Sequence, residues 1–231
     1  GEVAENLYGN IKFSNVSFAY VDGKNILENV NFSINKGEKI ALVGETGAGK
    51  TTIINLILGF YKINSGNIMF DGKNIDDISL ESLRKNISFI QQNPYVFNDT
   101  IKRNITVNNK SNISDEKIID ILKSVGLYNK VINFKNGIYE CVSDNSFSKG
   151  EKQLLAFARA IAKETSIYIF DEPTSNIDIE NEQKIKNIIN EVLKNATIIV
   201  IAHRPTTIEI VDKVFKLKNK KVVVQNKDNV F

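Results

Sequence analysis

The sequence predicts an α/β fold that carries a helical insertion. Short apolar runs separated by glycine-containing turns fill residues 11–43, a pattern typical of strands. From Thr100 to Lys163 the strand pattern fades and apolar residues recur at helical spacing. Strand and helix patterns alternate again from Ile167 onward, as in a sheet whose strands are joined by helices. A chain of 231 residues is long enough for one large domain or for a domain with a subdomain.

The N-terminal part is expected to be rich in strands. Period-two alternation predicts a strand over Ile11–Tyr20, and Asp22-Gly23 forms a turn. A second strand is expected over Ile26–Ile34 and a buried one over Lys39–Val43. Further elements follow in this part of the chain: a helix over Lys50–Phe60, a strand over Asn67–Phe70 and a short strand over Ile87–Ile90.

After Asn93-Pro94 the periodicity changes and then changes back. Within the helical region the clearest helices are predicted over Glu116–Val125 and Glu151–Ala162. The C-terminal part is expected to contain, in order, a strand over Ile167–Phe170, a helix over Glu180–Leu193, a strand over Thr197–Ile201, a helix over Thr206–Val211, and strands over Val214–Leu217 and Val222–Val224.

The composition is that of an ordinary globular protein. Hydrophobic residues make up 42% and charged residues 25%, and the net charge of +3 is too small to indicate nucleic-acid binding by itself. Lysines gather over residues 213–227, where valines at 222–224 stand among them. This pattern favours the solvated face of C-terminal strands, and a phosphate- or membrane-facing patch is the alternative.

Cys141 is the single cysteine, so no internal disulfide can form and a reducing compartment is favoured. No apolar run in the sequence reaches the length needed to cross a bilayer. The chain begins at Gly1 and its one methionine is Met69. We therefore expect a piece of a longer polypeptide or a processed chain.

A glycine-rich loop predicts a phosphate site. Residues 44–51 fit the pattern G-x-x-x-x-G-K-[ST], with a predicted strand before them and a predicted helix after them. Backbone N–H groups and the helix N-terminus would surround the phosphates, Lys50 would reach the β- and γ-phosphates, and Thr51 would bind Mg²⁺. A chance glycine-rich turn is the alternative, which the strand and helix context makes remote. The expected nucleotide contacts are Gly44, Glu45, Thr46, Gly47, Ala48, Gly49, Lys50, Thr51 and Thr52.

Two carboxylates close the apolar strand at residues 167–170. Asp171 can hold Mg²⁺ directly or through water, and Glu172 can orient or deprotonate an attacking water. Both could be ordinary strand-end acids, but the phosphate loop weakens that alternative. Shortly before the strand, Ser148-Lys149-Gly150 opens a predicted helix, and a helix start of this kind can face a phosphate. Together these motifs indicate one kind of ATPase.

In this order the motifs resemble the nucleotide-binding domain of ATP-binding cassette (ABC) transporters, and the resemblance runs from Ile11 to about Val224. The matching segments are Gly44–Thr51 for Walker A, Ile167–Glu172 for Walker B, Ser148-x-Gly150 for the signature, Ser175–Asp178 for the D-loop, Gln92 for the Q-loop, Ile201–Arg204 for the switch histidine, and Tyr20 for the adenine-stacking aromatic.

The resemblance implies a fold and a division of the chain. The fold is α/β, with a P-loop NTPase (RecA-like) core, an N-terminal antiparallel β subdomain and a helical insertion subdomain. A single nucleotide-binding domain would cover residues 1–231, with its core at 1–92 and 164–231 and its helical subdomain at about 93–163. ATP and Mg²⁺ are the implied cofactors.

The resemblance also implies residue roles. Glu172, His203 and Gln92 would be catalytic, and Thr51, Gln92 and Asp171 would hold Mg²⁺. Tyr20 would stack on adenine, and Ser148 and Gly150 would contact the ATP of a partner domain.

Several of these residues also have an ordinary interpretation. A lone histidine such as His203 is more often a satisfied core or surface group, and Tyr20 could be a core aromatic at a strand end. Gln92 could be a polar loop residue, and Asp178 could simply cap the helix expected from Glu180.

Segments 94–101 and 201–208 resemble the exporter branch of the family. This implies an ATPase that powers export through attached transmembrane domains, expected in the same polypeptide, at the cytoplasmic face of the membrane. It also implies a head-to-tail homo- or heterodimer with a second nucleotide-binding domain, and no nucleic-acid partner. The alternatives are an importer ATPase subunit, a soluble family member acting on nucleic acid or ribosomes, and a non-hydrolysing regulatory module.

The signature departs from the family pattern Leu-Ser-Gly-Gly-Gln. Lys149 stands at the middle glycine and Glu151 at the glutamine, and the loop at residues 141–146 is shorter than is usual in exporters. Ser148 and Glu151 can form a capping box, so the helix start is preserved. The carboxylate would nevertheless lie near a partner's ATP, only partly balanced by Lys149. A heterodimer with one degenerate site and a homodimer with an atypical signature both remain open.

Overall fold

The computed structural model describes residues 6–107, 112–202 and 205–225. Contacts divide the chain into two compact units. The first unit comprises residues 1–88, 166–170 and 195–231, and the second comprises residues 89–165 and 171–194. In the described ranges, no helix combines the length and the apolar composition needed to cross a bilayer.

The first unit contains an antiparallel sheet with the strand order β2-β1-β4-β5. In its central strand, Ile11 lies opposite Ile34 of β2 on one side and opposite Phe70 of β4 on the other. The buried residues of β1 alternate at period two on each side of a register shift, at Ile11 and Phe13 and then at Val16 and Phe18. The strands span Ile11–Ala19 (β1), Asn25–Ile34 (β2), Ser65–Phe70 (β4) and Lys73–Asn74 (β5).

A second sheet has the strand order β12-β11-β3-β10-β9-β6. Strands β10 and β11 each pair in parallel with β3, and β12 returns antiparallel to β11. The strands span Lys39–Val43 (β3), Ile87–Ile90 (β6), Ile167–Asp171 (β9), Thr197–Ile201 (β10), Lys213–Lys218 (β11) and Lys221–Gln225 (β12). The helices of the first unit are α1 (Lys50–Ile57), α2 (Leu80–Asn86) and α8 (Pro205–Ile208), with a 3₁₀ turn at Ile75–Asp77.

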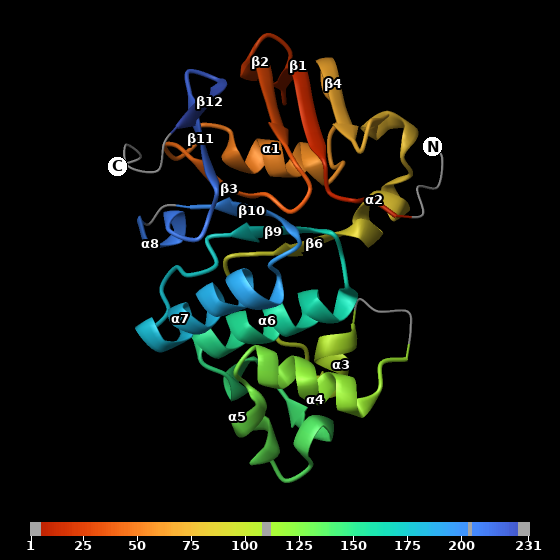
Figure 1. Ribbon diagram of the computed structural model, residues 1–231, viewed down its shortest axis with the longest axis vertical. Helices are drawn as coiled ribbons and strands as arrows, with labels where there is room; N and C mark the ends of the chain where they lie inside the picture. Colours follow the sequence, from red (N-terminus) through yellow and green to blue (C-terminus); the bar gives the residue numbers. More distant parts are fainter. Residues whose placement is uncertain (1–5, 108–111, 203–204, 226–231) are drawn as a thin grey trace. The chain divides into compact units, whose positions relative to one another are not determined.

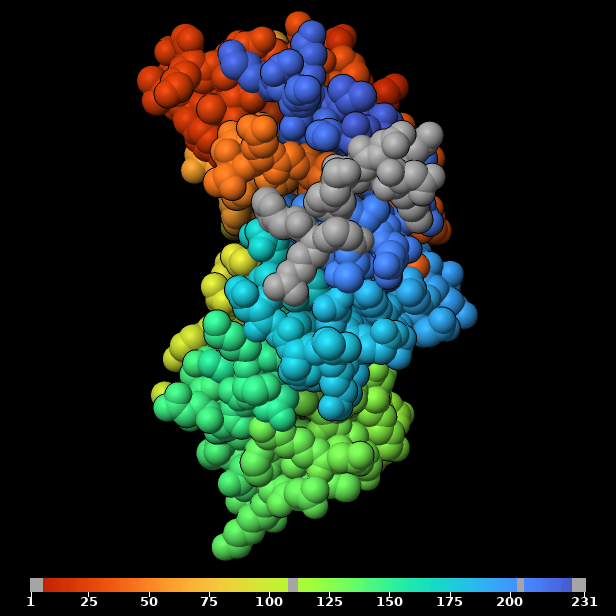
Figure 2. All heavy atoms as spheres, turned by 90° about the vertical axis from the view of Figure 1, so that its left-hand side faces the viewer, coloured from red at the N-terminus to blue at the C-terminus, as the bar shows by residue number. Residues whose placement is uncertain are grey.

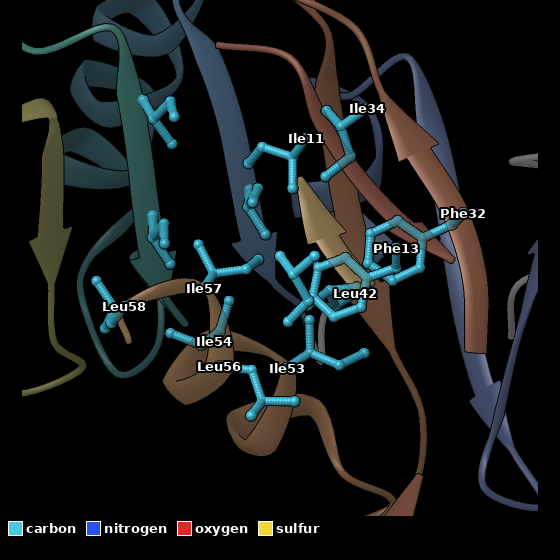
Figure 3. Packing of buried hydrophobic residues seen from close by; sticks show 14 of the residues in the cluster. Ile11, Phe13, Phe32, Ile34, Leu42, Ile53, Ile54, Leu56, Ile57 and Leu58 are labelled. Atoms are coloured by element: carbon cyan, nitrogen blue, oxygen red, sulfur yellow. The ribbon is translucent and has the colours of Figure 1, made fainter. Parts of the chain in front are cut away.

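The core of the first unit joins both sheets to α1. Figure 3 shows Ile53 and Ile57 of α1 together with Phe13 of β1 and Leu42 of β3, and all four belong to one buried cluster. Helix α1 is shorter than the predicted Lys50–Phe60, because Gly59 takes a left-handed conformation just after it. Because α1 packs into this core, the loop that precedes α1 is held in place at its C-terminal end.

The C-terminal hairpin β11–β12 lies beside the N-terminal strands (Figures 1 and 2). The Glu28 amide of β2 donates a hydrogen bond to the Lys220 carbonyl at 2.9 Å, and the Lys220 ammonium pairs with the Glu28 carboxylate at 2.7 Å. Strand β2 is thus tied to the turn of the β11–β12 hairpin.

In the second unit, α6 packs against α3, α4 and α7. The side chains of Leu154, Phe157 and Ala158 on α6 are fully buried. The helices are α3 (Ile101–Thr106), α4 (Asp115–Ser124), α5 (Tyr128–Ile132), α6 (Lys149–Lys163) and α7 (Ile179–Asn187). A short antiparallel pair joins β7 (Asp99–Thr100) to β8 (Cys141–Val142), and 3₁₀ turns cover Gly137–Tyr139 and Asp144–Ser146.

The predicted helix over Glu180–Leu193 is not one regular α-helix. Helix α7 ends at Asn187 and a π-helical turn covers Ile188–Val192, where the Leu193 amide donates a hydrogen bond to the Ile188 carbonyl.

The predicted α/β class, with an antiparallel sheet and a helical part, is confirmed.

Candidate functional site

The glycine-rich loop lies between the end of β3 at Val43 and the start of α1 at Lys50. Gly44 has a φ of 153°, and a Cβ atom there would lie 2.8 Å from the Leu217 carbonyl oxygen. Gly49 has a φ of 107°, and a Cβ atom there would lie 3.2 Å from Leu27. Both positions therefore require glycine, which leaves the loop backbone without side chains where a phosphate would approach.

The start of α1 suits an anion. Its N-cap is Gly49, which has no capping side chain, and its first turn contains no acidic residue. Lys50, at 6% exposure, donates from Nζ to the carbonyls of Gly44 and Glu45 at 2.5 and 2.9 Å. The ammonium is therefore held against the loop, beside amides and a positive helix end that favour a phosphate.

A cavity of about 480 Å³ adjoins this loop. Its wall includes Lys216, Lys218 and Lys220, so part of the C-terminal lysine run faces the phosphate loop and not only solvent. Among the described residues, the structure records an ion pair for Lys220 but none for Lys216 or Lys218. The other lining residues are Asn25, Ile26, Gly44–Ala48, Leu217 and Asn219.

Tyr20 lies near the start of α1 and is not a core residue, since 47% of it is exposed. Its hydroxyl lies 3.1 Å from Oγ1 of the buried Thr52. Phe18 and Tyr61 contact the ring edge-to-face, with centroids 4.8 and 5.0 Å away. The ring is thus held in a fixed position while much of its surface is open for stacking.

In the second unit, Gln92 and Glu172 come together across 80 residues of sequence. The Gln92 side-chain amide donates from Nε2 to Glu172 Oε2 at 2.9 Å and to Ser175 Oγ at 3.1 Å. Glu172 directly follows Asp171, the last residue of β9, and has a left-handed φ of 48°. Such a conformation is costly for a non-glycine residue and is often found at functional sites.

The start of α6 has the predicted capping box. The Glu151 amide donates to Ser148 Oγ at 3.2 Å, and the Ser148 amide donates to Glu151 Oε2 at 2.8 Å. Lys130 of α5, which the sequence analysis did not single out, places Nζ 2.6 Å from the same Glu151 oxygen. The signature carboxylate is therefore paired within its own chain.

Gly150 has a packing role that the motif alone did not reveal. A Cβ atom there would lie 2.4 Å from Nδ2 of Asn181 on α7. Asp178 caps α7 by accepting the Asn181 amide at 2.9 Å, and it also binds the Asn181 side chain at 2.7 Å. The hydrogen bond from the Asn181 amide, followed by that from its side chain, lowers the pKa of Asp178. Asp178 is thus the helix cap that the ordinary interpretation expected.

A groove of about 230 Å³ crosses the second unit near Gln92. Gln153 in its wall is only 2% exposed, and its Nε2 has no hydrogen-bond partner in the described part of the chain. The other lining residues are Asn93, Pro94, Tyr95, Asp144, Lys149, Lys152, Ser175 and Ile177. His203, with the neighbouring Arg204, lies outside the described residues.

The donors suit a nucleotide better than a resident metal. The glycine-rich backbone of residues 44–49 and the uncapped start of α1 fit a phosphate. Among the described residues there is no group of three or more His, Cys, Asp or Glu that could hold a metal ion. Mg²⁺ commonly takes one or two protein oxygens together with phosphate and water, so the Thr51 hydroxyl at the start of α1 fits it only as the partner of a bound phosphate. The other two predicted ligands, Gln92 and Asp171, belong to the second unit.

Comparison with known proteins gives three consistent results. A family model described as "ABC transporter" matches residues 27–175. Multidrug resistance-like ATP-binding protein MdlB of Buchnera aphidicola (subsp. Acyrthosiphon pisum) is 43% identical over 218 residues, covering 93% of this chain and 37% of the relative. ATP-dependent lipid A-core flippase of Pasteurella multocida is 38% identical over 218 residues, covering 93% of this chain and 38% of the relative.

A further relative and a solved structure agree with these. Probable multidrug resistance ABC transporter ATP-binding/permease protein YheH of Bacillus subtilis is 38% identical, covering 96% of this chain and 33% of the relative. The structure of a bacterial Atm1-family ABC exporter with ATP bound matches with a TM-score of 0.85 and 32% identity, covering 94% of this chain and 38% of that chain. The chain thus spans between 33% and 38% of the length of these proteins.

Proposed function

This chain belongs to the ABC transporter family, and we propose that it binds Mg-ATP and hydrolyses it to power export through attached transmembrane domains. Members of this family bind ATP, and the named relatives are ATP-dependent transporters. The relatives include a flippase and an ATP-binding/permease protein, which supports an exporter over an importer subunit or a soluble ATPase acting on nucleic acid or ribosomes.

In this proposal the first unit binds the nucleotide. The amides of residues 44–49 and the start of α1 surround the phosphates, and Lys50 turns from the loop carbonyls to the β- and γ-phosphates. Tyr20 stacks on adenine, and its hydroxyl contact with Thr52 keeps the ring in place. The family motifs imply that Thr51, Asp171 and Gln92 would hold Mg²⁺, which would neutralise charge on the transferring phosphoryl group.

The second unit supplies the group that activates water. Glu172 takes a proton from a water molecule whose oxygen attacks the γ-phosphorus, and the bond to the ADP oxygen breaks. Gln92 holds the Glu172 carboxylate through its side-chain amide, which orients the base before the water arrives. We assign His203 to stabilising the charge on the γ-phosphate, as the family motif implies.

The signature turn acts on a second nucleotide-binding domain. Ser148, the Gly150 amide and the start of α6 face the γ-phosphate of an ATP held by the partner domain. Closure and reopening of such a dimer would drive the transmembrane domains. Both a homodimer and a heterodimer with one degenerate site fit these residues.

The groove beside Gln92 is the proposed contact for a transmembrane domain at the cytoplasmic face of the membrane. It contains an exposed aromatic side chain at Tyr95 and a buried amide at Gln153 that has no hydrogen-bond partner among the described residues. A segment of an attached domain could bind that amide and cover that ring. Contact at this position would connect transport to Gln92, which lines the same groove.

The observation that carries the proposal is the hydrogen bond between Gln92 and Glu172, because it fixes the position of a carboxylate that directly follows the buried strand β9. The test is ATP-dependent uptake of a dye substrate into inverted membrane vesicles that contain the whole protein. Uptake that requires Mg-ATP supports export, whereas Mg-dependent ATPase without uptake of any tested substrate supports hydrolysis alone. Counting chain types in the purified transporter then separates the homodimer from the heterodimer.

A further inference from the structure

Lys130 and Glu151 form an ion pair at the turn that begins α6. The Lys130 Nζ atom lies 2.6 Å from Glu151 Oε2, although the residues are 21 positions apart in sequence. The same carboxylate oxygen accepts the Ser148 amide at 2.8 Å. One oxygen atom therefore joins Lys130 to the residue that opens the signature helix.

Lys130 also contacts the residue on the other side of Ser148. Its ammonium lies over the ring of Phe147, 4.8 Å from the centroid, which is a cation–π distance. Phe134 packs edge-on against the same ring with centroids 6.5 Å apart. Lys130 thus contacts Phe147, which directly precedes Ser148, and Glu151, whose carboxylate accepts the Ser148 amide.

The Glu151 carboxylate is ionised and its charge is neutralised locally. Burial raises the pKa of Glu151, but the hydrogen bonds from Lys130 and the Ser148 amide outweigh it, so the net pKa lies below the usual value. The two side chains are 30% and 26% exposed, so solvent screens this pair less than an open surface pair. The positive end of α6 favours the same carboxylate.

The ion pair of Glu151 is made by a lysine from α5 and not by the adjacent Lys149. In the described part of the chain the structure records no ion pair between Lys149 and Glu151, and Lys149 is a lining residue of the groove beside Gln92. That Lys149 partly balances the carboxylate stays a prediction.

We propose that Lys130 is a positioning residue of the signature turn. It neutralises Glu151 and keeps that carboxylate on the Ser148 amide, so that Ser148 and Gly150 can receive the γ-phosphate of ATP bound to a partner domain. This proposal rests on the proposed function. Without Lys130, an uncompensated negative charge would face the partner's phosphates and repel them. A neutral glutamine at position 151 can keep the capping box and needs no such lysine.

The test is a double-mutant cycle on the ATPase activity of the whole protein, with KM for ATP and kcat measured separately. Lys130→Met should lower kcat/KM about tenfold, mainly through KM, because a bare carboxylate then faces ATP. In the Glu151→Gln background the same Lys130→Met change should cost less than about threefold, because no charge is exposed. Lys130→Arg should retain activity, and Lys135→Met is the matched control, since Lys135 is exposed in the same unit.

The outcomes separate this inference from the proposed function. An unchanged kcat/KM in Lys130→Met overturns the inference. An equal loss in both backgrounds also overturns it, because Lys130 would then act only through folding. If Lys130→Met does not fold, the comparison in the Glu151→Gln background still decides whether the lysine is needed without the carboxylate. A parent protein that shows no Mg-dependent ATPase would contradict the proposed function itself.

Discussion

The Gln92 side chain donates a hydrogen bond to the Glu172 carboxylate at 2.9 Å, which joins the loop after β6 to the residue after β9. The same amide reaches Ser175 at 3.1 Å. Glu172 is therefore held in one orientation before any substrate binds. A general base must lie within hydrogen-bond reach of the water it deprotonates, so the orientation of Glu172 should affect the rate of ATP hydrolysis.

Replacing Gln92 with alanine should slow hydrolysis far more than it weakens ATP binding. The carboxylate would lose its orienting donor, and a fall in kcat of about 10- to 100-fold is expected. The measurement is steady-state ATPase beside equilibrium binding of a fluorescent ATP analogue. Gln91→Ala is the matched control, because Gln91 is its exposed neighbour. Equal loss in the two variants would show that the effect is not specific to the Glu172 contact.

Gly150→Ala should destabilise the second unit through packing. The added Cβ would lie 2.4 Å from Asn181 Nδ2 and 2.8 Å from Asn181 Cγ, so α6 and α7 must shift. Overpacking of this kind costs about 1–3 kcal/mol in the free energy of unfolding. Urea unfolding measures the loss, with the exposed neighbour Lys149→Ala as control. Asn181→Ala should restore part of the stability, and an unchanged midpoint in Gly150→Ala would contradict the close approach.

The cap at Asp178 should make stability depend on pH. Hydrogen bonds from the Asn181 amide and side chain hold the pKa of Asp178 below its usual value. A depressed carboxyl pKa stabilises the fold above the unfolded pKa of about 4 and loses that contribution as pH falls through the folded pKa. Asp178→Asn keeps a capping oxygen but no charge. The unfolding midpoint of the variant should lie below that of the parent at pH 6, and the difference should shrink toward pH 3. A difference that stays constant over this range would show that the charge of Asp178 does not contribute to stability.

The lysines of the loop cavity should contribute to ATP affinity. Lys216 and Lys218 line the cavity beside residues 44–48 without a recorded ion pair among the described residues. Removing either charge should raise the dissociation constant for ATP about threefold at low salt and less at high salt. Lys221→Ala is the matched control, since Lys221 lies opposite Lys218 in the hairpin but does not line the cavity. A similar rise in the dissociation constant for Lys221→Ala would show that the lysines act on ATP only through the net positive charge of the surface.

Local patterns in the sequence predicted much of the fold. Strand β1 follows from alternation on either side of a register shift between Phe13 and Val16, and the loop before α1 follows from glycines whose positions admit no side chain. The Ser148–Glu151 capping box was also readable, because both partners lie within one helical turn. The ends of α1 and α7 were misplaced, because Gly59 and the π-turn at Ile188–Val192 interrupt patterns that continue in the sequence.

The remaining features depend on contacts between distant segments. Lys130 reaches Glu151 only because α5 packs near the start of α6, and nothing in the residues around either one indicates this. Position 150 requires glycine because Asn181 of another helix lies against it, and the signature motif alone does not reveal this packing constraint. The Gln92–Glu172 bond likewise requires the fold, although the motifs named both residues.

The role of Glu172 is tested most directly by the ATPase activity of Glu172→Gln, measured beside its affinity for ATP. The parent is expected to hydrolyse ATP in the presence of Mg²⁺. The variant should bind ATP as tightly as the parent, while its kcat falls by about a hundredfold or more because the amide cannot accept the proton from water. A Glu172→Gln protein that hydrolyses ATP at the parent's rate would contradict the role assigned to this carboxylate.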